Sequence, residues 1–193
     1  MGTKKGREGV KTLKERIQFM QEGGQVVRFH QHIGHRLDTD ARHSHGVAML
    51  CYFLTAGAPT VTLLMAALSH DLAEQVTGDI PYPTKRRIPA LRRAVDDLER
   101  EVLTAYGLRF EILPMEQRIL SLADSLDGML YCASEAALGN RTALQHVYHV
   151  WYNSLAASAP FNTTEQEVIN AVHCIWEESN DPQGSKYAVG ITS

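Results

Sequence analysis

Residues 61–80 read VTLLMAALSHDLAEQVTGDI, and this stretch carries the strongest information about the fold. Its first part, 61–73, is apolar almost all round, which predicts a helix buried at the centre of a domain. Ionisable residues follow at the end of that helix, where Glu74 lies four positions after His70 and three after Asp71. Residues at these spacings are neighbours on a helix, so we expect the three groups to converge on one pocket.

Burying ionisable groups in an apolar setting is costly unless a partner compensates their charge. A divalent metal ion is one such partner, because it neutralises carboxylates and takes a neutral imidazole nitrogen as a ligand. An ordinary capping cluster at a helix end is the alternative. The segment alone leaves both interpretations open.

The remainder of the chain also reads as helical. Leu13, Ile17 and Met20 recur at helical spacing and predict a short entry helix before the Gly23-Gly24 break. Further helices are predicted over 44–56, 90–106, 114–138, 141–156 and 164–178. The proline-containing segment 77–89, TGDIPYPTKRRIP, predicts a surface loop. No alternating run is long enough to predict a strand, so the fold class is all-α.

Composition bounds the organisation. A chain of 193 residues with 44% hydrophobic content is long enough for one core, and we expect a leader at 1–11, one domain at 12–180 and a tail at 181–193. A net charge of −3 disfavours a nucleic acid polymer as partner. No signal peptide or membrane span is visible, which predicts no membrane partner and a cytoplasmic location. The three cysteines offer no CxxC pair and are expected to be reduced core thiols: Cys51, Cys132 and Cys174.

Two further segments carry candidate chemistry. Residues 28–46, RFHQHIGHRLDTDARHSHG, contain five of the nine histidines, of which His43 and His45 stand just before a buried helix. The segment SLADSLDG places Asp124 and Asp127 inside the longest apolar stripe. A carboxylate in such a place needs a partner.

The order of these motifs resembles a known family, the HD-domain phosphohydrolases. Arg28-Phe29-His30, His43-Ser44 before a VAML run, HDLAE, GDIP, the lysine of PTK and ADSL follow one another as in bacterial 5'-deoxynucleotidases, and phage dATP triphosphohydrolases are similar. The resemblance covers about residues 12 to 135. It implies a single HD-domain helical bundle with a central metal site.

The resemblance also implies roles for individual residues. The metal ligands would be His43, His70, Asp71 and Asp124. Their donor set does not choose among Zn²⁺, Mn²⁺, Co²⁺ and Fe²⁺, and Mg²⁺ entering with the substrate is a further option. Glu74 resembles the family's general acid or base, and Asp79 its second acid near the nucleotide. His45 and Asp127 lie outside the pattern.

Substrate contacts are implied in the same way. Arg28 and Lys85 would hold phosphate. Phe29 stands where the deoxynucleotidases tend to carry tryptophan, so it is expected to stack on the base or sugar, with plain core packing as the alternative. Lys85-Arg86-Arg87 can meet a triphosphate tail if all three side chains point inward, whereas such runs are often solvated. Whether Arg36 reaches substrate is also open.

The basic loop favours a dATP or dNTP triphosphohydrolase, releasing a deoxynucleoside and triphosphate. One alternative is a 5'-deoxynucleotidase that hydrolyses dNMP to a deoxynucleoside and phosphate. A second is a non-catalytic helical regulatory module. The expected partner is a small deoxynucleotide, and the protein is expected to form homo-oligomers. The expected location is a bacterial cell, and a phage origin of the gene is left open.

Overall fold

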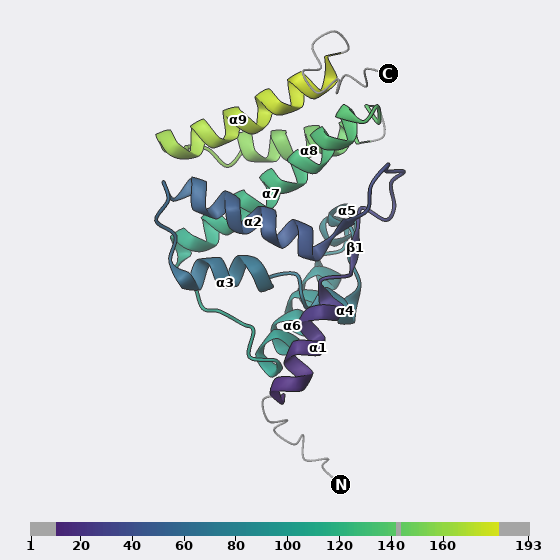
Figure 1. Cartoon of the computed structure of the whole chain (residues 1–193), viewed down its shortest axis with the longest axis vertical. Coiled ribbons are helices and arrows are strands. Elements are labelled where there is room, and N and C mark those ends of the chain that lie inside the picture. The colour runs from purple at the N-terminus through teal and green to yellow at the C-terminus, as the bar shows by residue number, and fades with distance from the viewer. Residues whose placement is uncertain (1–10, 142–143, 182–193) are drawn as a thin grey trace, which may run out of the picture.

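The computed structural model describes residues 11–141 and 144–181, and most of them are helical (Figure 1). The elements in order are α1 (Leu13–Gly23), β1 (Val27–Arg28), β2 (Asp38–Thr39), α2 (Asp40–Leu54), α3 (Val61–Ser69), α4 (Glu74–Thr77), α5 (Tyr82–Arg87), α6 (Pro89–Ala105), α7 (Pro114–Ala137), α8 (Gln145–Ala156) and α9 (Thr163–Asn180). The all-α class is therefore confirmed. The predicted leader and tail lie outside the described residues except for Lys11 and Asp181.

Helix ends place the candidate residues differently from the prediction. The helix expected from Ser44 begins at Asp40, so His43 belongs to the start of α2 rather than to the segment before it. The helix expected to continue to 73 ends at Ser69, and His70 is its C-cap. His70 and Asp71 therefore stand at the point where the chain leaves the buried helix.

The prediction of a continuous loop over 77–89 is wrong. Residues Tyr82–Arg87 form the short helix α5, with a proline in its first turn, and Pro89 then starts α6. Proline is accepted in the first turn of a helix because its fixed φ suits the helix and its missing N–H would have no partner there. The prolines begin two helices here instead of excluding one.

A small antiparallel sheet was also not predicted. Strands β1 and β2 pair Val27 with Thr39 and Arg28 with Asp38. Each strand has two residues, too few to produce an alternating pattern in the sequence. The pairing brings Arg28 beside the start of α2.

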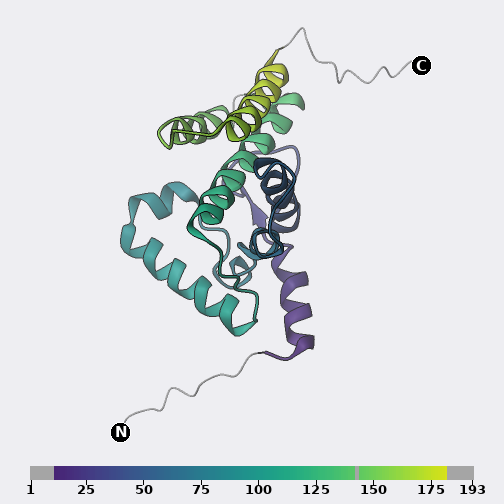
Figure 2. The ribbon, with the colours of Figure 1, turned by 90° about the vertical axis from the view of Figure 1, so that its left-hand side faces the viewer.

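The core is organised around α7, which packs against α2, α3, α8 and α9. Helices α8 and α9 lie together at one end of the molecule, and α1 lies toward the other (Figure 1). Seen from the side, α5 and α6 form an arm on one flank of the bundle (Figure 2). Tyr148 of α8 stacks on Trp176 of α9 with ring centroids 3.9 Å apart, which joins these two helices through aromatic contact.

Some apolar residues are more exposed than their pattern suggests. The entry helix is present as α1, but Leu13, Ile17 and Met20 are exposed, and Phe19 is the side chain it buries, stacked on Tyr106. Among the cysteines, Cys51 and Cys132 are buried as expected. Cys174 is exposed, because it lies on the outer face of α9, so the prediction of a core thiol is wrong there. No helix within the described ranges is long and apolar enough to cross a membrane.

Candidate metal centre and nucleotide pocket

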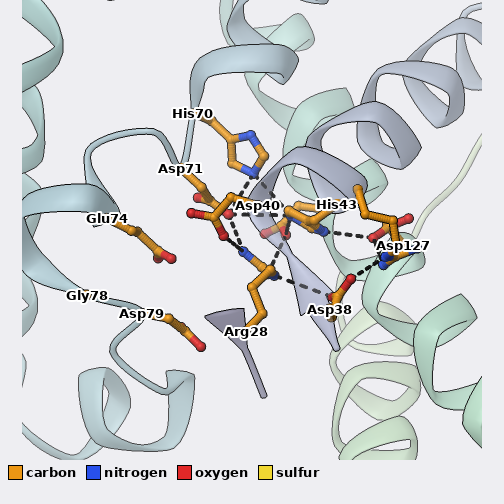
Figure 3. Close-up of polar contacts among 12 residues, drawn as sticks. Arg28, Asp38, Asp40, His43, His70, Asp71, Glu74, Gly78, Asp79 and Asp127 are labelled. Carbon is orange, nitrogen blue, oxygen red and sulfur yellow. Dashed lines mark hydrogen bonds and ion pairs between the residues drawn. The ribbon is translucent and has the colours of Figure 1, made fainter. Parts of the chain in front are cut away.

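The candidate site lies where β1, α2, the end of α3 and α7 meet (Figure 3). His43 comes from the start of α2 and is completely buried. His70 and Asp71 follow α3, and Asp124 comes from the middle of α7. Segments far apart in the chain thus contribute to one cluster.

Four residues implied as metal ligands are brought together. His43 Nε2 lies 3.3 Å from His70 Nε2, 3.4 Å from Asp71 Oδ2 and 3.1 Å from Asp124 Oδ1. His70 Nε2 lies 3.3 Å from Asp71 Oδ2. One atom from each of His43, His70 and Asp71 falls within 4.8 Å of the other two, a grouping that could hold a metal ion.

Both imidazole rings are oriented as metal ligands require. His70 Nδ1 lies 2.8 Å from the carbonyl oxygen of Ala67, an acceptor, so this nitrogen donates its proton. His43 Nδ1 lies 2.7 Å from Asp127 Oδ2, which also accepts. When each ring is neutral and carries its proton on Nδ1, the Nε2 lone pair faces the cluster, as in histidines whose second nitrogen is fixed by an acceptor. The residues present therefore fit a divalent metal ion.

The electrostatics point the same way. Burial favours the neutral form of His43, but hydrogen bonds to Asp124 and Asp127 outweigh it and raise the pKa of His43 to about 9. The carboxylates thus create a negative field that attracts positive charge. A divalent cation satisfies such a field, and the mixed nitrogen and oxygen donors suit several transition metals.

Arg28 supplies positive charge to this cluster. Its guanidinium forms a short ion pair with Asp71, and Nη1 lies 3.6 Å from Asp40 Oδ1. Nη2 lies 4.0 Å from Asp124 Oδ1, and Nε lies 3.8 Å from Asp38 Oδ2. The side chain is therefore surrounded by carboxylates at the edge of the candidate metal site.

Sequence reasoning missed Asp38 and Asp40, which are both buried. Both carboxylate oxygens of Asp40 lack a hydrogen-bond partner among the described residues. Burial and the nearby Asp71 carboxylate raise the pKa of Asp40 to about 7. The available signal was the acidic pair in DTDARHS, at the point where α2 begins and just before its apolar part.

Glu74 and Lys85 also reach the site. Glu74 is buried at the start of α4, and its Oε2 makes no hydrogen bond within the described chain. Burial and Asp71 raise the pKa of Glu74 to about 9. Lys85 Nζ of α5 lies 3.8 Å from Glu74 Oε1 and 3.7 Å from Glu99 Oε1 of α6. The short helix α5 is thus the element that carries this lysine to Glu74.

Asp79 lies just beyond α4 and its side chain is mostly buried. Asp79 Oδ2 is 3.5 Å from His30 Nδ1. The side chains of Glu74 and Asp79 extend from neighbouring stretches of the chain toward the side where Arg28 lies (Figure 3). The two acids implied by the resemblance therefore occupy one side of the cluster.

Phe29 both lines the pocket and packs against the core. Its ring stacks on Tyr131 with centroids 4.6 Å apart and meets the edge of Trp151 at 5.8 Å. Its φ of 54° is unusual for a residue with a side chain. Trp151 comes from α8, which sequence reasoning did not connect with the site.

A pocket of about 530 Å³ joins the polar cluster to this aromatic region. Its polar side includes Arg28, Asp71, Glu74, Asp79, Lys85 and Asp124. Its other side includes Phe29, His32, His146, Val147, Val150 and Trp151. The volume is in the range typical of small-molecule sites.

Several candidate residues stay outside the pocket. His45 is exposed on α2, and Arg86 and Arg87 are exposed on α5. None of these three residues lines the described pocket. Arg36 instead lies 3.9 Å from Glu135 Oε1.

The fold belongs to a known class of enzymes. The structure resembles the HD phosphohydrolase DatZ of cyanophage S-2L, solved with dA and one catalytic Zn²⁺ ion, with a TM-score of 0.66 over 88% of this chain and 98% of that one, at 20% identity. An HD-domain phosphohydrolase of Listeria innocua gives a TM-score of 0.60 over 86% of each chain, at 21% identity. The fold is that of the HD-domain phosphohydrolases.

The sequence identifies the family within this class. The model of the YfbR-like family, described as 5'-deoxynucleotidase YfbR-like, matches residues 17–169, so the chain belongs to that family. The 5'-deoxynucleotidases YfbR of Salmonella newport and Salmonella dublin are each 29% identical over 54% of this chain. The match spans 64% of the length of these curated relatives.

Proposed function

We propose that this protein is a metal-dependent 5'-deoxynucleotidase that hydrolyses a dNMP to a deoxynucleoside and phosphate. The observation that carries the proposal is the charge of the pocket. Among the described lining residues, the only arginine is Arg28 and the only lysine is Lys85. Arg86 and Arg87 are exposed outside the pocket. Two cations suit a single phosphate group, while acidic side chains around them would repel a longer tail.

This proposal replaces the triphosphohydrolase that the basic run in the sequence favoured. That prediction depended on Lys85, Arg86 and Arg87 all pointing inward. Only Lys85 does so, because a helix turns by about 100° per residue and α5 exposes the next two side chains. Membership of the YfbR-like family supports the same choice.

His43, His70, Asp71 and Asp124 would hold the metal ion, with Zn²⁺, Mn²⁺, Co²⁺ and Fe²⁺ compatible with the donors. When bound, such an ion supplies Lewis-acid activation of water and of a phosphoryl oxygen. The zinc described for the phage neighbour is consistent with this set. Removal of the ion by a chelator should abolish turnover and leave the helices in place.

Arg28 and Lys85 would bind the phosphate oxygens. In the structure both cations are paired with carboxylates, Arg28 with Asp71 and Lys85 with Glu74 and Glu99. An incoming phosphate can accept hydrogen bonds from the same donors. Charge-assisted bonds of this kind orient the phosphorus for in-line attack and stabilise the charge on its oxygens.

Glu74 and Asp79 would manage the protons. Attack forms a bond from the water oxygen to phosphorus, breaks the bond from phosphorus to O5', and requires a proton on the leaving O5'. Glu74 is buried with one oxygen available, which suits a group that takes a proton from water or delivers it to the leaving oxygen. Asp79, held near His30, is the second candidate for this transfer.

The aromatic end of the pocket would receive the base and sugar. Phe29 and Trp151 expose ring surface there, beside His32 and His146 of the pocket wall. Aromatic rings stack on nucleobases with little dependence on base identity. The dA bound to the phage neighbour supports a deoxynucleoside as the kind of ligand.

The self-association of the protein into homo-oligomers stays a prediction.

The decisive experiment is a panel of the four dNMPs and four dNTPs with added Mn²⁺, Zn²⁺, Co²⁺ or Mg²⁺, in which phosphate, pyrophosphate and triphosphate are separated. Phosphate from dNMPs is the expected product. Triphosphate from dNTPs would restore the triphosphohydrolase, and silence with every metal would favour the non-catalytic helical module. His70→Ala and Asp71→Ala should each remove both turnover and bound metal while circular dichroism retains the helical signal.

A further inference from the structure

Asp127 lies outside the implied ligand set, yet it makes the closest polar contact of the buried His43 ring. Its Oδ2 is 2.7 Å from His43 Nδ1, the nitrogen directed away from the candidate metal site. Asp127 follows Asp124 by three residues on α7 and is 2% exposed. The two carboxylates thus contact opposite nitrogens of one imidazole, since Asp124 lies beside Nε2.

The Asp127 carboxylate is itself held in place from α2. Arg42 Nη2 lies 2.8 Å from Asp127 Oδ2, and Arg42 Nε forms a short ion pair with Asp38. The neighbouring turn of α2 leaves room for the carboxylate, because a Cβ added at Gly46 would lie 1.9 Å from Asp127 Oδ1. These contacts fix the acceptor that faces His43.

We propose that Asp127 is a positioning residue that keeps the proton of His43 on Nδ1 and directs Nε2 toward the metal ion. The inference rests on the proposed function, because it presumes that His43 is a ligand. A carboxylate that accepts from the distal nitrogen fixes the tautomer and the ring orientation, and it makes the ligating nitrogen more basic. Asp127 therefore acts through His43 and does not bind the ion itself.

A purely structural explanation would assign Asp127 to the ion pair with Arg42 alone. The two explanations predict different outcomes for metal affinity. Loss of an outer carboxylate of this kind typically weakens metal binding by about 10- to 100-fold. Loss of an ion-pair partner changes the unfolding free energy without a specific effect on metal affinity.

The test uses the full-length protein, with Zn²⁺ and Mn²⁺ affinities measured by competition with a chelator and stability measured by urea unfolding. Asp127→Ala is expected to weaken metal binding by about 10- to 100-fold. Asp127→Asn should fall between, because its amide oxygen still accepts from Nδ1 but carries no charge. Arg42→Met is the matched control, since it removes the ion pair but keeps the Asp127 carboxylate as the acceptor for His43 Nδ1, and its metal affinity should change less than that of Asp127→Ala.

Gly46→Ala gives a second route to the same displacement without altering any ionisable group. Its added methyl should push the Asp127 carboxylate aside and reproduce the metal-binding loss of Asp127→Ala. In the metal-loaded unsubstituted protein, ¹⁵N shifts of the His43 ring should report a proton on Nδ1 and none on Nε2. The same shifts test the proposal even if Asp127→Ala fails to fold.

Affinities within twofold of the unsubstituted protein in both Asp127→Ala and Gly46→Ala would overturn the positioning role, as would a proton on Nε2 of His43 in the metal-loaded protein. These results leave the proposed function intact if the unsubstituted protein binds metal and hydrolyses dNMPs. Failure of the unsubstituted protein to bind any divalent metal would instead overturn both proposals.

Discussion

Replacing Gly128 by alanine should destabilise the protein because the Trp151 ring occupies the space of the new methyl group. A Cβ at this position would lie 1.6 Å from Trp151 Cζ3 and 1.8 Å from Cη2, whereas ordinary contact starts at 3.4 Å. The ring must therefore retreat by about 1.8 Å, the gap between 1.6 and 3.4 Å. Overpacking of this kind costs about 1 to 3 kcal/mol, and we expect the free energy of unfolding to fall by that amount.

The same substitution should change sign when Trp151 is absent. Alanine is favoured over glycine inside a helix by about 1 kcal/mol, so Gly128→Ala should stabilise the Trp151→Ala variant by up to about that amount. Urea unfolding of the four proteins, followed by circular dichroism, measures both effects. Because Trp151 also lines the pocket, Gly128→Ala should raise the KM for dNMPs. An equal effect of Gly128→Ala in the two backgrounds would refute the packing on which this reasoning depends.

Three further predictions concern charged residues. Lys85→Met should lower kcat/KM for dNMPs by about 10- to 100-fold, measured by steady-state kinetics. The reason is the lost hydrogen bond to a charged group, which contributes roughly 1.5 to 3 kcal/mol. Arg86→Met and Arg87→Met are the matched controls on α5, and each should change kcat/KM by less than about threefold, because a solvated charge contributes little. A loss equal to that of Lys85→Met would instead support the triphosphohydrolase. Glu135→Gln should destabilise the protein at neutral pH by about 1.5 to 3 kcal/mol. Hydrogen bonds from Asn140 and from the backbone N–H groups of His35 and Arg36 outweigh burial and lower the pKa of Glu135 below its ordinary 4.5. The stabilisation from Glu135 is therefore present above that pH and is lost below it. Urea unfolding should show the stabilities of the unsubstituted protein and of Glu135→Gln converging as the pH falls from about 5. A difference in unfolding free energy that stays constant with pH would contradict the reasoning.

The sequence by itself predicted the helical class and the main candidate ligands. Periodicity identified α3 and α7 because long apolar stripes at helical spacing have few other structural explanations. His70 and Asp71 were recognisable because ionisable side chains at the end of such a helix need compensation. Such local features depend on residues close together in the sequence and not on tertiary contacts between helices and strands.

Other features followed only from tertiary packing. Trp151 joins the pocket because α8 folds back on α7, and no spacing in the sequence encodes that contact. Asp38 is buried in a two-residue strand, which is too short to leave a periodic signal, and Asp40 is buried two residues later at the start of α2. The helical conformation of α5 directs Arg86 and Arg87 away from the pocket, so that of the three consecutive cations only Lys85 lines it. The residue types were visible in the sequence, but the number of charges that face the substrate depends on helix phase and on contacts between distant segments.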